Sequence, residues 1–461
     1  MYPWQKKVKL HFIGIGGIGM SGIAECLISL GHIVSGSDLN PSANTERLKK
    51  LGAEIFIGHK KENIAGATLI VYSSAINSSN PEMAHALKLN LPIMKRAEML
   101  AELMRLKIGL AVAGTHGKTT TTSFLATILQ EAGLDPTYII GGIVENLKGN
   151  AKVGQGDFLV AEADESDGSF LLLSPIMSVI TNIDNDHLDF YGSKEKLFDC
   201  FVEFANKIPF YGICALYIND PMIKKLKGRM KKPYLTFGLK EEGEKTPDFW
   251  AENIISHKFK TQYDLYYKGE FATKITINIP GEHNVINSLG AIALAHNLNI
   301  DIQVIARSIA KFKGVGRRFE LLYTGPGVEI IDDYAHHPTA ISSTIKTVIE
   351  TRGQDKLKVI FEPHRFSRTQ DLWDKFIHCF EGVHEIVLCP VYPAGEGPIK
   401  GINSTNLASE INKSYPGLVT SLTGLDDLND HLIPESSERV TILVLGAGSI
   451  GKKARQIVGG F

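Results

Sequence analysis

The segment from Ile108 to Thr122 constrains the fold more than any other part of this 461-residue sequence. An apolar run of strand length leads into a turn with two glycines, and an apolar pattern of helical spacing follows over 124–129. This order predicts a strand, a phosphate-binding loop and a helix, because glycines let backbone N–H groups point at an anion and the helix N-terminus adds positive charge. Val112 stands where the common loop pattern has a glycine, so the loop is a variant, and an ordinary strand-to-helix turn is the alternative. The predicted nucleotide-binding residues of the loop are Gly114, Thr115, His116, Gly117, Lys118, Thr119 and Thr120.

Side chains on and near this loop predict a site for a nucleoside triphosphate with Mg²⁺. Lys118 can reach the β- and γ-phosphates, and the Thr119 hydroxyl can bind the metal. A short apolar strand, 158–161, ends at Glu162, where nucleotide hydrolases and kinases place a Mg²⁺ ligand; a solvated acidic loop is the alternative. A third strand leads into a polar run in which His187 is the candidate ligand of a second ion.

A second glycine turn lies near the N-terminus. The strand 8–13 runs into a G-x-G-x-x-G turn, a helix is expected over 20–30, and an acidic residue follows about 20 positions after the turn. This arrangement binds a nucleotide diphosphate and its ribose, and a nicotinamide or flavin cofactor is as compatible with it as another nucleotide-linked ligand. His59 is as consistent with a surface histidine as with contact to a base. The candidate ligand-binding residues here are Gly16, Gly17, Ile18, Gly19, Asp38, His59, Ser73 and Ser74.

Length and composition limit the remaining possibilities. The length predicts about three domains. We expect them to span 1–106, 107–313 and 314–461. A formal net charge of -1 gives no electrostatic case for nucleic acid or a membrane surface. The five cysteines are scattered without a C-x-x-C pair, and neither a signal peptide nor an apolar run long enough to span a membrane is present. We therefore expect a globular protein of the cytoplasm.

Arginines in the last third are candidates for anion recognition. Arg317 and Arg318 follow two glycines that indicate a hinge, and both can reach phosphate. Arg365 and Arg368 lie three positions apart beyond a strand, so they could form a fork for a carboxylate such as that of an amino acid. Solvated surface arginines are the alternative.

Two further patterns carry weaker predictions. Asn284 and Asn287 precede the helical pattern 289–298 and lie three apart, so their amides could read the edge of a base or cap the helix. The turn 446–451 is a third glycine turn, and we interpret it as close packing of a strand against a helix.

At this point the motifs resemble a known family, the Mur ligases of bacterial peptidoglycan synthesis, over nearly the whole chain and in order. The matching motifs are Gly114-Thr-His-Gly-Lys-Thr-Thr-Thr, Glu162-Ala-Asp-Glu-Ser-Asp, Asn185-Asp-His-Leu-Asp, Gly281-Glu-His-Asn, Gly316-Arg-Arg-Phe-Glu, Asp332-Asp-Tyr-Ala-His-His-Pro and Tyr392-Pro-Ala-Gly-Glu. The resemblance implies an α/β protein with an N-terminal Rossmann-like UDP-binding domain, a central P-loop ATPase-type domain and a C-terminal Rossmann-like domain. It also implies amide formation coupled to ATP hydrolysis through an acyl phosphate.

The resemblance assigns roles to individual residues. The catalytic group would be Lys118, Glu162, His187 and Arg317, with Thr119, Glu162 and His187 as ligands of two Mg²⁺ ions. ATP would contact His283, Asn284, Asn287, Arg318 and Asp333, and the incoming amino acid would contact Tyr334, His336, Arg365 and Arg368.

Two positions indicate the branch that adds L-alanine to UDP-N-acetylmuramate. Several relatives carry a carbamylated lysine fourteen residues after the histidine of the D-H-x-D motif, and Phe201 stands there in this chain. The first glycine turn contains Ile18 where the recycling branch, which attaches a ready-made tripeptide, has threonine. The recycling activity is the alternative within the family, and an NAD-dependent oxidoreductase is the alternative from another class. A monomer or weak homodimer is expected.

Overall fold

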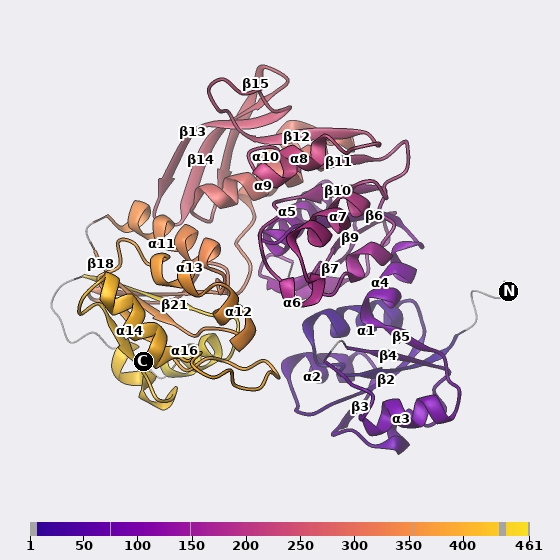
Figure 1. Cartoon of the computed structure of the whole chain (residues 1–461). Coiled ribbons are helices and arrows are strands. Elements are labelled where there is room, and N and C mark those ends of the chain that lie inside the picture. The colour runs from indigo at the N-terminus through magenta and orange to yellow at the C-terminus, as the bar shows by residue number, and fades with distance from the viewer. Residues whose placement is uncertain (1–6, 74, 148, 354, 433–438, 460–461) are drawn as a thin grey trace. The chain divides into compact units, whose positions relative to one another are not determined.

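The computed structural model describes residues 7–73, 75–147, 149–353, 355–432 and 439–459 (Figure 1). Contacts divide the chain into two compact units. Unit 1 comprises Met1–Asp184, Ser193–Trp250 and Asn287–Ile309, and unit 2 comprises Asn185–Gly192, Ala251–Ile286 and Ala310–Phe461. Separate sheets with helices in the first third, the middle and the last third of the chain confirm the predicted three-domain α/β fold.

The first sheet of unit 1 is parallel and has the strand order β3-β2-β1-β4-β5. Its central strand β1 is almost wholly buried, as expected for a parallel strand with helices over both faces. The glycine turn follows β1, where the order of strands reverses, and open α/β sheets bind ligands at such a point. The strands are β1 (Lys9–Ile13), β2 (Ile33–Asp38), β3 (Glu54–Ile57), β4 (Leu69–Tyr72) and β5 (Ile93–Lys95); the helices are α1 (Ile18–Ser29), α2 (Ala43–Lys50), η2 (Lys61–Ile64), α3 (Pro81–Lys88) and α4 (Arg96–Met104).

The second sheet of unit 1 places β6 between β10 and β9, both parallel to it. Its order within the unit is β12-β11-β10-β6-β9-β7-β8. The strands are β6 (Ile108–Ala113), β7 (Thr137–Val144), β8 (Gly149–Lys152), β9 (Phe158–Glu162), β10 (Met177–Ile180), β11 (Ile213–Tyr217) and β12 (Tyr234–Leu239). The helices are α5 (Lys118–Glu131), η3 (Ser169–Leu172), α7 (Lys194–Ala205), α8 (Pro221–Lys227) and α10 (Ile302–Ala310). The residues of α9 (Glu282–Asn297) and β13 (Phe249–His257) are divided between the two units.

Helix α5 follows the predicted phosphate loop and is buried on all sides from Thr119 to Leu129. Buried hydroxyls usually have partners. For two of those on α5 the helix itself supplies the acceptor: Thr122 Oγ1 donates to the Lys118 carbonyl at 2.8 Å and Ser123 Oγ to that of Thr119 at 2.6 Å. Helix α9 begins at Glu282, seven residues before the predicted pattern 289–298, because an acidic first turn continues the helix back to the Pro280–Gly281 pair.

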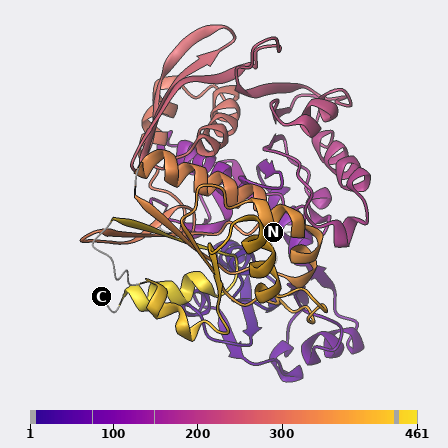
Figure 2. The same cartoon turned by 60° about the vertical axis from the view of Figure 1, so that its left-hand side comes forward.

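Unit 2 contains a six-stranded sheet of order β16-β17-β21-β18-β19-β20, antiparallel only between β16 and β17. Helices lie on both faces of this sheet (Figure 2). Adjacent residues of β17 face opposite sides: Ile331 packs in one core with α11, α13 and α14, and Ile330 packs in a second core with α15 and α16. The strands are β16 (Glu320–Gly325), β17 (Val328–Asp333), β18 (Lys356–Phe361), β19 (Glu385–Leu388), β20 (Val419–Ser421) and β21 (Val440–Leu445), beside the hairpin of β14 (Lys260–Tyr267) and β15 (Glu270–Ile277). The helices are α6 (Leu188–Tyr191), α11 (Pro338–Arg352), α12 (Phe366–Asp371), α13 (Trp373–His378), α14 (Ser404–Ser414), η4 (Asp426–Leu428), α15 (Asn429–Leu432) and α16 (Ile450–Val458).

Across the residues described, no helix combines the length and the apolar character that crossing a bilayer requires.

Candidate active site

The predicted phosphate loop joins β6 to α5 at the carboxyl edge of the central sheet. Gly114 and Gly117 have φ values of +136° and +83°, a region that side-chain-bearing residues rarely adopt. A Cβ on Gly117 would collide with Oδ1 of Asn287. The structure therefore brings the predicted base-binding Asn287 to the loop that was predicted to hold the phosphates.

Lys118, the first residue of α5, points back over the loop. Its Nζ donates to the Gly114 carbonyl at 2.6 Å and to both carboxylate oxygens of Glu165 at 2.9 and 2.7 Å. Burial alone would lower the pKa of Lys118, but the negative charges of Glu165 and Asp164 outweigh it and raise that pKa. Burial raises the pKa of Glu165 to about 7 despite the lysine beside it. Glu165 was not predicted, because nothing in its local sequence distinguishes it from the other carboxylates of the run 162–167.

Glu162 and Thr119, both predicted Mg²⁺ ligands, lie together. The Thr119 hydroxyl donates to Glu162 Oε2 at 3.2 Å, and the Gly141 N–H donates to Oε1 at 2.5 Å. Two ligand oxygens at adjacent corners of a Mg²⁺ octahedron are about 3 Å apart. Two hard oxygens at this spacing fit that ion.

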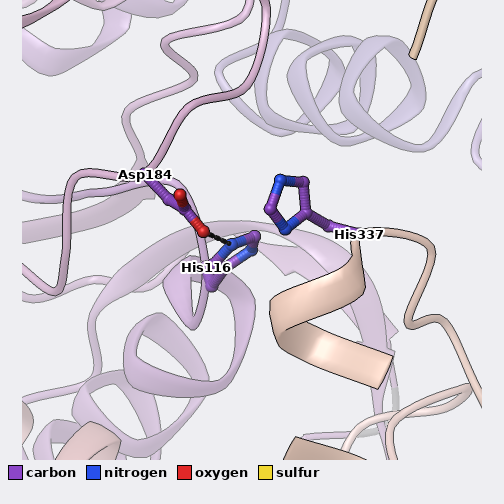
Figure 3. A group of neighbouring side chains, drawn as sticks. All are labelled: His116, Asp184 and His337. Carbon is purple, nitrogen blue, oxygen red and sulfur yellow. Dashed lines mark hydrogen bonds and ion pairs between the residues drawn. The ribbon is translucent and has the colours of Figure 1, made fainter. Parts of the chain in front are cut away.

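The segment after β10 fixes the other side of the loop. The His116 N–H donates to Asn182 Oδ1 at 2.8 Å, and the Thr181 hydroxyl donates to the His116 carbonyl at 2.5 Å. The His116 ring lies 3.3 Å from an Asp184 carboxylate oxygen (Figure 3). This contact holds His116 beside the loop and gives it a partner inside unit 1.

The first glycine turn is closed by β2. Gly14 and Ile15 donate their N–H groups to the Ser37 carbonyl at 2.8 and 3.0 Å, and the Gly16 N–H donates to Asp38 Oδ2 at 2.8 Å. Ser73 adjoins the turn, since a Cβ on Gly14 would lie 3.2 Å from its Cβ. Ser74 lies outside the described residues.

The structure decides between the alternatives for His59 and adds a second residue to this region. His59 is not a surface side chain: its side chain is 11% exposed and its Nδ1 lies 2.9 Å from Ser37 Oγ. Arg96, which the sequence analysis did not select, lies against Gly19 and donates to Asp164 Oδ2 at 3.2 Å. A cation at the first position of helix α4 opposes the helix dipole, and this was the signal in the sequence that could have identified it.

In unit 2 the predicted amino-acid residues gather at the carboxyl edge of the six-stranded sheet. Arg368 Nη2 lies 3.1 Å from Asp186 Oδ1, and Arg365 Nε lies 3.7 Å from Glu396 Oε1. Burial opposes ionisation of Asp186, but the Arg368 charge outweighs it and lowers the carboxyl pKa. The His187 ring lies 3.6 Å from the same carboxylate.

The aromatic members of this edge are half-buried next to the arginines. Tyr334 and His336 meet edge to face with ring centroids 5.2 Å apart. Burial and the Arg368 charge lower the pKa of His336, so its ring is neutral. Arg317 and Arg318 stack on Tyr334 at 5.0 and 4.9 Å.

Arg317 and Asp333 already make internal contacts. The Arg317 guanidinium donates to the Gly446 carbonyl at 2.5 Å, and Asp333 accepts the N–H groups of Phe319 and Ala335 at 2.7 and 2.8 Å. Burial raises the pKa of Asp333. Both residues therefore make structural contacts around the predicted hinge 313–320, in addition to any contact with a ligand.

The other predicted ATP residues of unit 2 lie at the start of α9. His283 Nδ1 lies 3.0 Å from Ser343 Oγ, and burial together with Arg318 lowers the pKa of His283 to about 4. Asn284 Nδ2 donates to the Pro280 carbonyl at 2.6 Å. A capping side chain would accept an N–H instead, so the capping alternative is wrong for Asn284.

The fold and the phosphate loop between β6 and α5 define the class of protein. It is a three-domain α/β protein whose central sheet is of the P-loop type. The sequence matches "Mur ligase family, catalytic domain" over 9–108, "Mur ligase middle domain" over 112–295 and "Mur ligase, glutamate ligase domain" over 317–448. The chain belongs to the Mur ligase family.

Relatives that match over nearly their full length indicate which member of the family this chain is most similar to. Two proteins named UDP-N-acetylmuramate--L-alanine ligase, from Geobacter sp. (strain M21) and Geobacter sulfurreducens, are each 48% identical over 96% of this chain and 95% of their own. The solved UDP-N-acetylmuramate-alanine ligase MurC of Thermotoga maritima is 30% identical, with a TM-score of 0.83, and covers 98% of this chain and 99% of that one. A murein peptide ligase of Psychrobacter arcticus 273-4 shares the fold at 23% identity and a TM-score of 0.72.

Proposed function

We propose that this chain is the ATP-dependent ligase that joins L-alanine to the lactyl carboxylate of UDP-N-acetylmuramate through an acyl phosphate, in peptidoglycan precursor synthesis. The observation that carries the proposal is the full-length likeness, at 48% identity, to relatives named for this reaction. Two solved ligases named for the peptide-adding reaction are 23% and 27% identical, against 30% for the solved ligase named for alanine, so the recycling reaction is less well supported.

The geometry supports a division of labour between the predicted domains 1–106, 107–313 and 314–461. In the first, the turn closed by Ser37 and Asp38 would hold the UDP diphosphate and ribose. In the second, Lys118 would exchange Glu165 for oxygens of the transferring phosphoryl group. The third would supply the arginines that bind the amino acid. The reaction would take place in the cytoplasm.

Thr119 and Glu162 would hold Mg²⁺ in unit 1, and His187 is the proposed ligand of a second ion in unit 2. Such an ion supplies charge that offsets repulsion between the substrate carboxylate and the γ-phosphate. Arg365 and Arg368 would orient the alanine carboxylate, and the neutral rings around them would leave its charge to the arginines.

Phosphate release tests the proposal. The complete chain is incubated with ATP, Mg²⁺, UDP-N-acetylmuramate and alanine, and each component is omitted in turn. We expect release to require all four, and a ready-made tripeptide to replace alanine poorly. Release that depends on the tripeptide would establish the recycling reaction instead, and no phosphate release from the complete mixture would place the chain in another class.

A further inference from the structure

A carboxylate is buried within the N-terminal sheet and its flanking segments. Glu82, in the first turn of α3, has a fully buried side chain. Removing a carboxylate from water is costly unless hydrogen bonds replace the water. The replacements come from Ser37 Oγ and Asn63 Nδ2, each at 2.5 Å, and from the Lys60 N–H at 3.3 Å. His11 Nε2 lies 3.6 Å away on another side.

These partners keep the carboxylate ionised. Burial alone would raise the pKa of Glu82, but the adjacent His11 ring and the donors on Ser37 and Asn63 outweigh it and hold the pKa at about 2. An ionised carboxylate has no proton and can only accept hydrogen bonds. Every group that contacts it must therefore donate.

This requirement fixes which nitrogen of a neutral His59 ring carries the proton. Its Nδ1 lies 2.9 Å from Ser37 Oγ and 3.3 Å from Glu82 Oε2. The one hydroxyl proton of Ser37 is already donated to Glu82, so the serine oxygen accepts from His59. Nδ1 consequently carries the proton, and in a neutral imidazole the other nitrogen, Nε2, is then a hydrogen-bond acceptor.

The same network places His59 at the proposed nucleotide site. The Ser37 carbonyl accepts the first two N–H groups of the glycine turn, and the Gly58 N–H donates to the Asp38 carbonyl at 2.8 Å. Asn63 also donates to the Gly58 carbonyl at 3.1 Å, which ties the segment that carries His59 to Glu82. Movement of the Glu82 carboxylate would therefore release both the histidine and its loop.

We propose that Glu82 is a positioning residue that fixes His59 with Nε2 as an acceptor, and that His59 recognises a hydrogen-bond donor of the uridine part of the substrate. This inference rests on the proposed binding of a UDP sugar. Uridine offers two kinds of donor, the ring N3–H and the ribose hydroxyls. Cytosine has an unprotonated N3, which would face the histidine acceptor with a second acceptor.

Binding to the full-length chain tests the inference by calorimetry. The ligands are UDP, N3-methyl-UDP, 2′-deoxy-UDP, 3′-deoxy-UDP and CDP, and the variants are His59→Ala, Glu82→Gln and the double variant. Glu62→Gln is the matched control, because Glu62 lies on η2 in the same region with a side chain 69% exposed. We expect His59→Ala and Glu82→Gln each to weaken UDP binding by about 3- to 10-fold, the range for one hydrogen bond. The double variant should lose little more, since both changes remove one interaction.

The analogues identify the donor. If it is N3–H, the unmodified chain should discriminate against N3-methyl-UDP and CDP; if it is a hydroxyl, it should discriminate against one deoxy analogue. The discrimination should disappear in His59→Ala. Glutamine, whose amide oxygen can occupy the position of Nε2, should restore part of the affinity at position 59, whereas asparagine should not.

Three results would overturn the inference: no discrimination by the unmodified chain among the analogues, wild-type affinity in Glu82→Gln, or additive losses in the double variant. The ratio of KM values gives a readout that unfolding would not mimic, because the KM for the UDP sugar should rise while kcat and the KM for ATP stay unchanged. If Glu82→Gln does not fold, the analogue series with His59→Ala and His59→Gln still decides. A folded wild-type chain that binds no UDP would reject the proposed function itself.

Discussion

The phosphate loop of unit 1 and the glycine turn 446–451 of unit 2 share one pattern, a buried strand, glycines and a helix. They differ in the side chains that contact the N-terminus of the helix. Among the described residues, α5 has no side-chain cap and no acidic residue in its first turn, and Lys118 begins the helix. In unit 2 the carboxylate of Glu362, from the end of β18, accepts the Ile450 N–H at 3.1 Å and the Ser449 hydroxyl at 2.8 Å.

This comparison shows why the same backbone pattern predicts a ligand site in one place and not in the other. The positive end of a helix attracts an anion. At α16 the chain provides that anion itself, and a Cβ on Gly448 would collide with Glu362 and Tyr392. The interpretation of this turn as close packing is thereby confirmed. We expect ligands at this edge to be held by side chains beyond the strand ends, such as Arg365.

The largest effect should come from Lys118. Lys118→Ala should lower kcat by at least about 10³-fold, because the lysine offsets charge on the transferring phosphoryl oxygens. Binding of the UDP sugar should be nearly unchanged, as should activity in the control Lys225→Ala, an exposed position on α8. Steady-state kinetics and calorimetry measure the two properties. Full ATP turnover in Lys118→Ala would remove the basis of the comparison, since the loop would then be an ordinary turn.

Arg365→Ala and Arg368→Ala should have the next largest effect. Each should raise the KM for alanine by about 10- to 100-fold, because a charge-assisted hydrogen bond contributes about 1.5–3 kcal/mol. The KM for ATP should stay constant, and hydroxylamine should still trap the acyl phosphate without alanine. Arg439→Ala, 74% exposed in the same unit, is the control. Weakened ATP binding with an unchanged KM for alanine would make these arginines phosphate ligands.

His187→Ala tests whether unit 2 contributes a metal ligand. We expect the Mg²⁺ concentration needed for half-maximal activity to rise by about 10-fold, because one ligand of the second ion is lost. A Mg²⁺ titration of the variant is compared with that of His257→Ala, which alters an exposed position on β13. An unchanged midpoint would restrict metal binding to Thr119 and Glu162.

Glu362→Ala should remove the carboxylate that occupies the N-terminus of α16 and leave that helix end free for an added anion. Loss of the carboxylate leaves the N–H of Ile450 without that partner, so we expect a loss of about 1–2 kcal/mol in the free energy of unfolding. Phosphate should stabilise the variant more than it stabilises Glu381→Ala, an exposed control that keeps the carboxylate of Glu362. Denaturant unfolding with and without phosphate measures both. If phosphate stabilised the two proteins equally, the helix end alone would not distinguish the two regions.

The sequence predicted the features that depend on neighbouring residues. The apolar runs identified β1 and β6, and the glycines that follow each strand marked the turns. Parallel topology then brings strand ends to one edge, so the grouping of Lys118, Thr119 and Glu162 was predictable. The site roles themselves and the domain boundaries stay predictions.

Partners distant in the sequence could not be predicted. Glu165 lies 47 positions from Lys118, and Glu362 lies 88 from Ile450. Either carboxylate could equally have been solvated, because the choice depends on packing that no local pattern encodes. The same reason explains why Arg96 and Glu82 were not selected and why His59 remained undecided between surface and site.

The smallest expected effect concerns the pH dependence of the Glu165 contact. In the folded chain burial raises the pKa of Glu165 to about 7, above its ordinary value of 4.5. Below about pH 4.5 the carboxyl is neutral in both the folded and the unfolded state. Between these values the unfolded chain releases the proton and the folded chain keeps it, so this group's contribution to stability falls as pH rises towards 7.

Glu165→Gln removes that titration, so the stability of the variant should decline less steeply over this interval. We expect the difference between the two curves to change by about 1–2 kcal/mol, or about 1–2 °C in Tm for a chain of this length, between pH 5 and 7. Calorimetric melting at constant ionic strength measures it, with Glu195→Gln on α7 as the exposed control. Parallel curves would mean that Glu165 stays ionised throughout, and that its attraction to Lys118 exceeds the effect of burial. The phosphate loop would then resemble the C-terminal turn, as a site already closed by the chain's own carboxylate.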